Sequence, residues 1–75
     1  MKADTLKKRI DSLATHILFD YNNKPCGIDP ITRSQIDIWY GDAVITANSV
    51  DEAMQTPLFD GLSLEDICTK LQNVE

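Results

Sequence analysis

The stretch QIDIWYGDAVITA, residues 35–47, holds two runs of β-branched and aromatic residues separated by Gly-Asp. Such runs are typical of β-strands, and a two-residue loop with glycine first suits a type II′ hairpin turn. This turn would fix the register, with Tyr40 opposite Ala43 and Ile36 opposite Ala47. One face of the hairpin then consists of Ile36, Ile38, Tyr40, Ala43, Ile45 and Ala47. Because the turn chemistry and the apolar pattern agree, the stretch predicts an antiparallel hairpin with one buried face.

The opposite face of this hairpin carries Asp37, Trp39, Val44 and Thr46. If no helix covers this side, Trp39 and Val44 form an exposed apolar patch, and tryptophan is typical of binding hot spots. In the alternative, Trp39 belongs to the core, because a small domain with a single tryptophan commonly buries most of it. The sequence leaves this choice open.

The region before the hairpin begins with apolar residues at intervals of three and four, which indicate one face of a helix over residues 3–21. This face comprises Leu6, Ile10, Leu13, Ile17 and Tyr21, and it is widened by Ala14 and Leu18. The cluster NNKPCG at residues 22–27 then interrupts the pattern. We therefore expect a structured loop over residues 22–34, with one short extended segment near residues 25–28. Whether this segment adds a third strand stays open.

The expected loop is a second candidate for function, because long ordered loops often carry binding residues. It contains Cys26, and Lys24 nearby would slightly favour the thiolate form of that cysteine. A reactive thiol is therefore one interpretation of Cys26, and an inert loop cysteine is the other.

Two further helices are expected after the hairpin. Ser49 precedes Glu52 by three residues, which is the spacing of a capping box, and Pro57 ends the helix that follows. A turn at residues 58–61 leads to a last helix that begins at Ser63, with an apolar face of Leu64, Ile67, Cys68, Leu71 and Val74. The predicted fold is one α+β domain over residues 1–75, in the order helix, loop, strand, strand, helix, helix. An isolated hairpin is only marginally stable, so we expect the N- and C-terminal helices to pack on it.

Charge is unevenly distributed along the 75 residues, whose formal net charge is −5. Residues 34–75 contain eight acidic side chains and one basic side chain, whereas residues 1–33 contain six basic and four acidic ones. An acidic domain disfavours direct binding to nucleic acid, because that binding depends on lysine and arginine. The acidic part serves either solubility or the recognition of a basic partner.

Several kinds of chemistry are not expected from this sequence. His16 is the only histidine, so a single chain cannot form a site with two histidine ligands. Three scattered glycines do not make a phosphate-binding loop, and the calcium-loop pattern is absent. We therefore expect no catalytic residue, metal site or cofactor. Because Lys7, Lys8 and Arg9 interrupt the N-terminal region, neither a secretory signal nor a membrane span is expected, and a cytoplasmic location follows.

These features predict a small acidic protein-binding module without enzymatic activity, acting as a regulator, adaptor or inhibitor of a larger protein. The candidate protein-binding residues are Trp39, Val44, Asp37, Thr46, Lys24 and Cys26. A homodimer is compatible with the thin core of so short a chain. The alternatives are a phage-type acidic decoy that inhibits a nucleic-acid-binding protein, and a small enzyme using Cys26 or His16. The element order is similar to that of small accessory proteins of bacteria and phages, although no motif carries this similarity.

Overall fold

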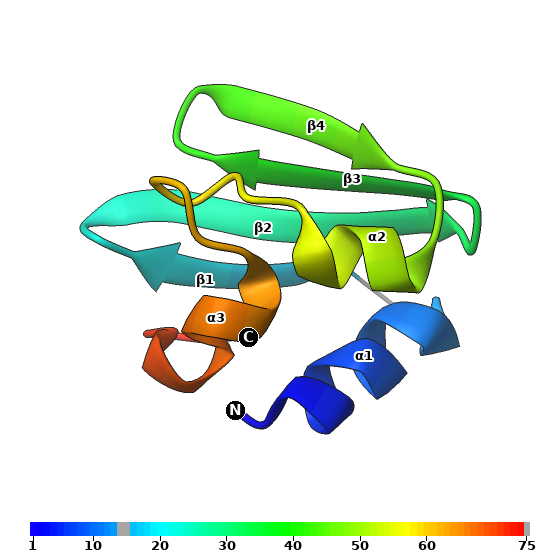
Figure 1. Ribbon diagram of the computed structural model, residues 1–75. Helices are drawn as coiled ribbons and strands as arrows, with labels where there is room; N and C mark the ends of the chain where they lie inside the picture. The colour runs from blue at the N-terminus through cyan, green and yellow to red at the C-terminus, as the bar shows by residue number, and fades with distance from the viewer. Residues whose placement is uncertain (14–15, 75) are drawn as a thin grey trace.

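The computed structural model describes residues 1–13 and 16–74, and its four strands form one antiparallel sheet in the order β1-β2-β3-β4. The elements are α1 (Ala3–Ser12), β1 (Ile17–Tyr21), β2 (Lys24–Thr32), β3 (Gln35–Tyr40), β4 (Ala43–Ala47), α2 (Val50–Gln55), α3 (Leu64–Ile67) and the 3₁₀ helix η1 (Cys68–Lys70). Figure 1 shows the labelled helices together on one side of the sheet. The small α+β domain is confirmed, but the expected element order is wrong because the sheet has four strands and not two.

The hairpin of residues 35–47 is confirmed in its register. Tyr40 pairs with Ala43, Ile38 with Ile45, and Ile36 with Ala47. Gly41 has a φ of +58°, whereas its neighbour Asp42 does not adopt a positive φ, as a type II′ turn requires. The inward face is buried at Ile36, Ile38, Tyr40 and Ala47.

The expected helix over residues 3–21 is wrong in its second half. The helix ends at Ser12, and Leu13 adopts a left-handed φ of 56° while its N–H donates to the carbonyl of Ile10 at 3.2 Å. Residues Ile17–Tyr21 form β1 instead. A spacing of four residues fits a helical face, but it also fits the two-residue period of a strand, so Ile17 and Tyr21 supported both. Ala14, which was expected to widen the helical stripe, lies outside the described residues.

The expected loop over residues 22–34 is also wrong, because Lys24–Thr32 form β2, the longest strand of the sheet. Asn22 and Asn23 make the two-residue turn that joins β1 to β2, and their φ values are 56° and 62°. Two successive positive φ values define a type I′ turn, which asparagine tolerates better than most residues. The asparagines therefore form a hairpin turn and do not start a loop.

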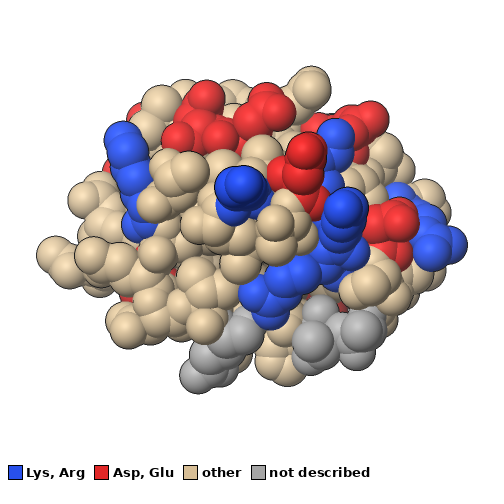
Figure 2. Space-filling model, turned by 90° about the horizontal axis from the view of Figure 1, so that it is seen from below, with Lys and Arg blue, Asp and Glu red and all other residues tan. Residues whose placement is uncertain are grey.

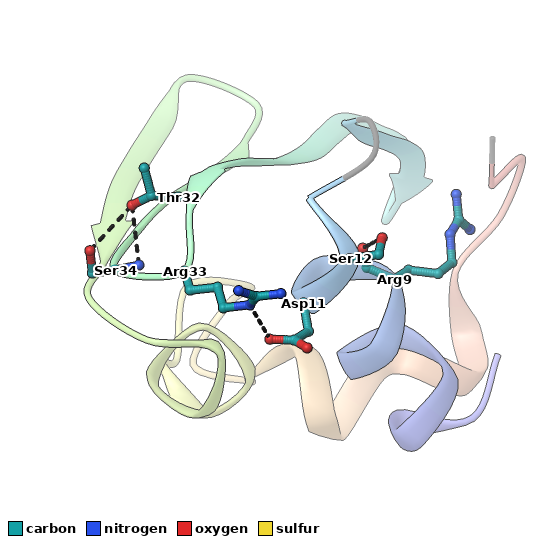
Figure 3. A network of polar contacts seen from close by, with 6 residues as sticks. All are labelled: Arg9, Asp11, Ser12, Thr32, Arg33 and Ser34. Atoms are coloured by element: carbon teal, nitrogen blue, oxygen red, sulfur yellow. Dashed lines mark hydrogen bonds and ion pairs between the residues drawn. The ribbon is translucent and has the colours of Figure 1, made fainter.

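Both prolines of β2 occupy positions where a missing N–H disturbs little pairing. Pro25 lies near the start of the strand, and Pro30 lies beyond Ile28, which is opposite the first residue of β1. The β2–β3 register shifts between Pro30 and Thr32, as in a β-bulge. At the adjoining turn, the Nε of Arg33 lies 3.0 Å from Oδ1 of Asp11, which ties this end of the sheet to α1 (Figure 3).

The helices after the hairpin begin where the sequence predicts. The Ser49 side chain accepts a hydrogen bond from the N–H of Glu52 at 3.0 Å, and α2 ends before Pro57. Ser63 and Asp66 form a complete capping box at the start of α3. The last helix is shorter than expected, because α3 ends at Ile67 and passes into η1.

One hydrophobic core lies between the sheet and the helices. Its buried members are Leu6, Ile10, Ile17, Phe19, Cys26, Ile28, Ile36, Ile38, Tyr40, Ala47, Ala53, Met54, Phe59, Leu64, Ile67 and Cys68. The elements that cover the sheet differ from the expected ones: α2 contacts β3 and β4, α1 contacts β2, and α3 packs on α2. The hairpin is thus covered mainly by α2 and not by the two terminal helices.

Candidate functional site

The side of the sheet that faces away from the helices is the candidate site, and we call it the outer face. Side chains alternate between the two faces along each strand, so the strand register identifies the outward-pointing residues. They include Leu18, Asp20, Pro25, Gly27, Asp29, Asp37, Trp39, Val44 and Thr46. Four of the six predicted binding residues, Trp39, Val44, Asp37 and Thr46, thus lie on one uncovered face.

An apolar row crosses the middle of the outer face. Leu18 pairs with Gly27, Gly27 with Trp39, and Trp39 with Val44, so that the row has one position on each of the four strands. The indole ring of Trp39 lies over Gly27, where an added Cβ would overlap the ring. Val44 is 64% exposed, and Trp39 is half-buried. Trp39 is therefore not a core residue, and it presents a partly exposed ring held close to the sheet.

A shallow hollow of about 270 Å³ lies beside the indole ring. Its lining residues are Leu18, Phe19, Asp20, Pro25, Cys26, Trp39 and Asn73. Nδ2 of Asn73 donates a hydrogen bond to Oδ2 of Asp20 at 2.8 Å, so the C-terminal segment holds this carboxylate. The hollow therefore combines apolar walls with a fixed negative charge.

Two further aspartates lie directly opposite each other on this face. Asp29 of β2 pairs with Asp37 of β3, and Asp37 pairs in turn with Thr46. The hydroxyl of Thr46 donates to Oδ1 of Asp37 at 2.8 Å. Like charges in directly opposite positions destabilise a sheet. None of the outward-pointing residues named above is a lysine or arginine, so these aspartates have no basic neighbour among them.

Cys26 borders the hollow beside Trp39, but it offers almost no accessible surface there. Its side chain points into the core and is only 2% exposed, and burial raises the pKa of the Cys26 thiol. The Sγ atom donates to the carbonyl of Lys24 at 3.3 Å. The expected loop position of Cys26 is wrong, because Cys26 and Lys24 both belong to β2. Of the two interpretations of Cys26, the pKa favours the inert thiol, because burial raises it more than the Lys24 charge lowers it.

Lys24 belongs to a separate group of side chains at one end of the sheet. Its Nζ lies 4.7 Å from the centre of the Tyr40 ring. The hydroxyl of Tyr40 donates to Oδ2 of Asp60 at 2.7 Å, and Nδ2 of Asn22 donates to the same oxygen at 2.9 Å. The bond from Tyr40 lowers the pKa of Asp60 and raises the pKa of Tyr40.

This group connects three turns of the chain and borders a cavity of about 630 Å³. The cavity is lined by Lys24, Pro25, Tyr40, Gly41, Asp42, Ala43, Leu58, Asp60 and Gly61. Among its polar side chains, Tyr40 bonds to Asp60 and Lys24 lies over the Tyr40 ring, so these contacts explain how the turns are held together. The sequence offered no signal for it, because Asn22, Tyr40 and Asp60 are far apart along the chain.

The helical side of the molecule carries charges of both signs. Figure 2 shows lysine and arginine side chains beside aspartate and glutamate on this side; α1 contains the basic residues 7–9, and the first turns of α2 and α3 are acidic. Nζ of Lys7 lies 3.1 Å from Oδ1 of Asp51, and this contact raises the pKa of Lys7. Part of the basic stretch is therefore used to join α1 to α2.

In the part of the chain that the structure describes, no three His, Cys, Asp or Glu side chains are grouped so that they could hold a metal ion, and His16 is exposed. None of the helices in the same region has the length and apolar character needed to cross a membrane.

Comparison with known proteins yields no relative: no protein-family model, no curated protein and no solved structure matches this chain. The features that bear on function are therefore those of the site itself: the apolar row, the hollow beside Trp39 and the aspartates around them.

Proposed function

We propose that this chain is a small protein-binding module whose outer face docks a basic segment of a larger protein. The observation that supports this most strongly is the apolar row at Trp39, bordered by Asp20, Asp29 and Asp37 with no outward-pointing lysine or arginine among its strand neighbours. Isolated exposed apolar residues are ordinary, but a contiguous row on an uncovered sheet face is typical of an interaction site.

The chemistry of the face indicates which side chains it would accept. An arginine or lysine can lie over the indole of Trp39, because the face of an aromatic ring attracts cations. The opposed carboxylates of Asp29 and Asp37 suit a guanidinium group, which forms two parallel hydrogen bonds with a carboxylate. An aliphatic side chain of the partner would fill the hollow beside Trp39. The expected ligand is therefore a segment that alternates basic and aliphatic residues.

The proposal is tested by titrating the protein with a peptide library in which arginine, lysine or glutamate flank a central leucine. We expect binding to the basic peptides, and a loss of at least about tenfold in affinity for Trp39→Ala, as is usual for a central aromatic anchor. The matched control is Leu62→Ala, which also truncates an exposed apolar residue but lies outside the outer face. Circular dichroism establishes that both variants remain folded.

Three results would contradict the proposal. These are a preference for the acidic peptides, equal affinity of wild type and a folded Trp39→Ala variant, or no binding to any member of the library. If Trp39→Ala unfolds instead, Val44→Ala provides a second test, because its side chain is mostly exposed and contributes little to the core.

A narrower version of the same function is an acidic decoy, in which the aspartates imitate nucleic-acid phosphates and inhibit a nucleic-acid-binding protein. The directly opposed Asp29 and Asp37 favour it, because they concentrate negative charge on adjacent strands. In that version, DNA or RNA competes with this chain for the partner. The buried free thiols of Cys26 and Cys68 support a proposed location in a reducing compartment such as the cytoplasm.

A further inference from the structure

The two edges of the sheet are treated differently by the rest of the chain. At the β1 edge, Asp20 and Gln72 exchange two backbone hydrogen bonds of 2.7 and 2.9 Å, so the C-terminal segment covers that strand. At the β4 edge, no residue in the described ranges 1–13 and 16–74 pairs with the outer side of the strand. Figure 1 shows β4 as the uncovered strand at the top of the sheet.

The register identifies which backbone groups of β4 point away from the sheet. In a two-residue hairpin, the pair that closes the turn exchanges both hydrogen bonds, and bonded and non-bonded pairs then alternate. Ala43, Ile45 and Ala47 therefore bond to β3, while the N–H and C=O groups of Val44 and Thr46 point outward. Gly41, just after β3, donates its N–H to the carbonyl of Pro25 in β2. This bond agrees with the alternation, because it means that the backbone N–H and C=O groups of the odd-numbered residues of β3 point towards β2 and those of the even-numbered residues point towards β4.

The β4 edge lacks the features that normally prevent strand pairing. Natural edge strands are protected by charged residues, proline, bulges or a covering segment. The sequence of β4 is AVITA, with no charge and no proline, and its pairing with β3 contains no register shift. An uncharged and regular edge of this kind is a template for another strand.

We propose that β4 pairs with β4 of a second copy of this chain, antiparallel and centred on Ile45. This register places Val44 opposite Thr46 of the second copy, so that the outward-pointing groups of both residues form hydrogen bonds. Ile45 then lies opposite Ile45 of the second copy, and Ala43 lies opposite Ala47. The two copies are related by a twofold axis, which is the most common symmetry of protein dimers.

Charge favours self-association through the β4 edge over self-association through the outer face. Two outer faces would bring their aspartates together, and the acidic chains would repel each other. The five residues of β4 contain no ionisable side chain, so strand pairing brings no like charges into direct opposition. Pairing at the edge would also extend the apolar row, because Val44 is its last member on each copy.

The test is sedimentation velocity of the full chain between about 10 µM and about 1 mM, a range that covers weak protein association. We expect wild type to shift from the mass of one chain towards that of two as its concentration rises. Thr46→Pro removes an outward N–H without touching a bond to β3, and it should weaken the dimer at least about tenfold. Thr46→Ala is the matched control, because it loses the same hydroxyl bond to Asp37 but keeps the N–H.

A second measurement keeps the test valid if Thr46→Pro does not fold. Hydrogen exchange of the wild-type Val44 and Thr46 amides should slow as the protein concentration rises, while exchange at Asp20 stays constant. A monomer at every concentration overturns the proposal, as does a dimer that Thr46→Pro leaves intact or one without protection at Val44 and Thr46. Because Trp39→Ala should still dimerise, failure of this proposal and failure of the proposed binding function are distinguishable.

Discussion

The close approach of Trp39 and Gly27 is the residue-level feature on which the candidate site depends. The indole occupies the space that a side chain at position 27 would need. Since residue 27 is paired directly with Trp39 across the sheet, the glycine lets the half-buried ring lie close to the backbone of β2. A ring held in this way loses little conformational freedom on binding, which benefits affinity.

Gly27→Ala is therefore expected to destabilise the fold by about 1–3 kcal/mol, the usual range for a group forced into occupied space. The added methyl group pushes the indole off the sheet. Urea unfolding followed by circular dichroism measures the change in the free energy of unfolding.

The control for this prediction is a double-mutant cycle with Trp39→Ala. If the indole causes the clash, Gly27→Ala should cost much less in the Trp39→Ala background, with a coupling free energy of about 1 kcal/mol or more. Equal effects in both backgrounds would show that the alanine acts on the backbone and not on the ring.

The sequence predicted part of this site correctly because a turn fixes both strands that contribute to it. Gly41-Asp42 determined the β3–β4 register, and that register placed Trp39 beside Val44 on the face opposite the core. Gly27 was missed because its position under the indole depends on the β2–β3 register, which no local pattern specifies. For the same reason, Leu18 was assigned to a helical stripe and not to the apolar row.

At the level of elements, the first hairpin was missed because its signals favour other structures when taken singly. Intervals of four residues supported a helix over Ile17–Tyr21, and Pro25 and Pro30 argued against a strand. Only the sheet context resolves these conflicts, because it provides the alternating burial of β1 and places the prolines where little pairing is lost. The segments from α2 onward were predicted more accurately, because serine caps are local features.

The type I′ turn at Asn22-Asn23 leads to a prediction about the β1–β2 hairpin. Asn23→Gly should raise the free energy of unfolding by about 0.5 kcal/mol, because glycine reaches a positive φ with less strain than any other residue. Asn23→Ala should lower it by about 1 kcal/mol, because alanine pays the full penalty of the left-handed region. Thermal unfolding of the two variants beside wild type measures both effects.

Asn22 is left unchanged in this comparison because its side chain also bonds to Asp60. If Asn23→Gly and Asn23→Ala have equal stability, position 23 does not require a positive φ in solution, and the assignment of the turn would have to be revised.

Across the whole molecule, the two layers of the fold differ in how charge is arranged. Basic and acidic side chains are mixed on the side of the helices (Figure 2), whereas Asp20, Asp29 and Asp37 point outward from the sheet. A basic partner is therefore attracted to the aspartates of the outer face, which favours its approach to that side. This grouping arises only in the folded chain, since strand register collects aspartates that are widely spaced in the sequence.

The opposed pair Asp29 and Asp37 provides a prediction in which stability and binding change in opposite directions. Asp29→Asn removes one of two like charges in direct opposition, so it should raise the free energy of unfolding by a few tenths of a kcal/mol. The same change should weaken binding of basic peptides several-fold and make that binding less sensitive to salt, because one attractive charge is lost. Urea unfolding and peptide titrations at low and high salt measure the two effects on the same protein.

Asp4→Asn is the matched control, since it makes the same change in net charge on α1, on the opposite side of the fold. If both variants weaken binding equally, the partner responds to net charge and not to the outer face. If Asp29→Asn weakens binding but destabilises the fold, Asp29 has a structural role, and the pair is not kept for recognition. Increased stability with reduced binding, confined to Asp29→Asn, would mean that the sheet tolerates a repulsive pair because a partner cation relieves it.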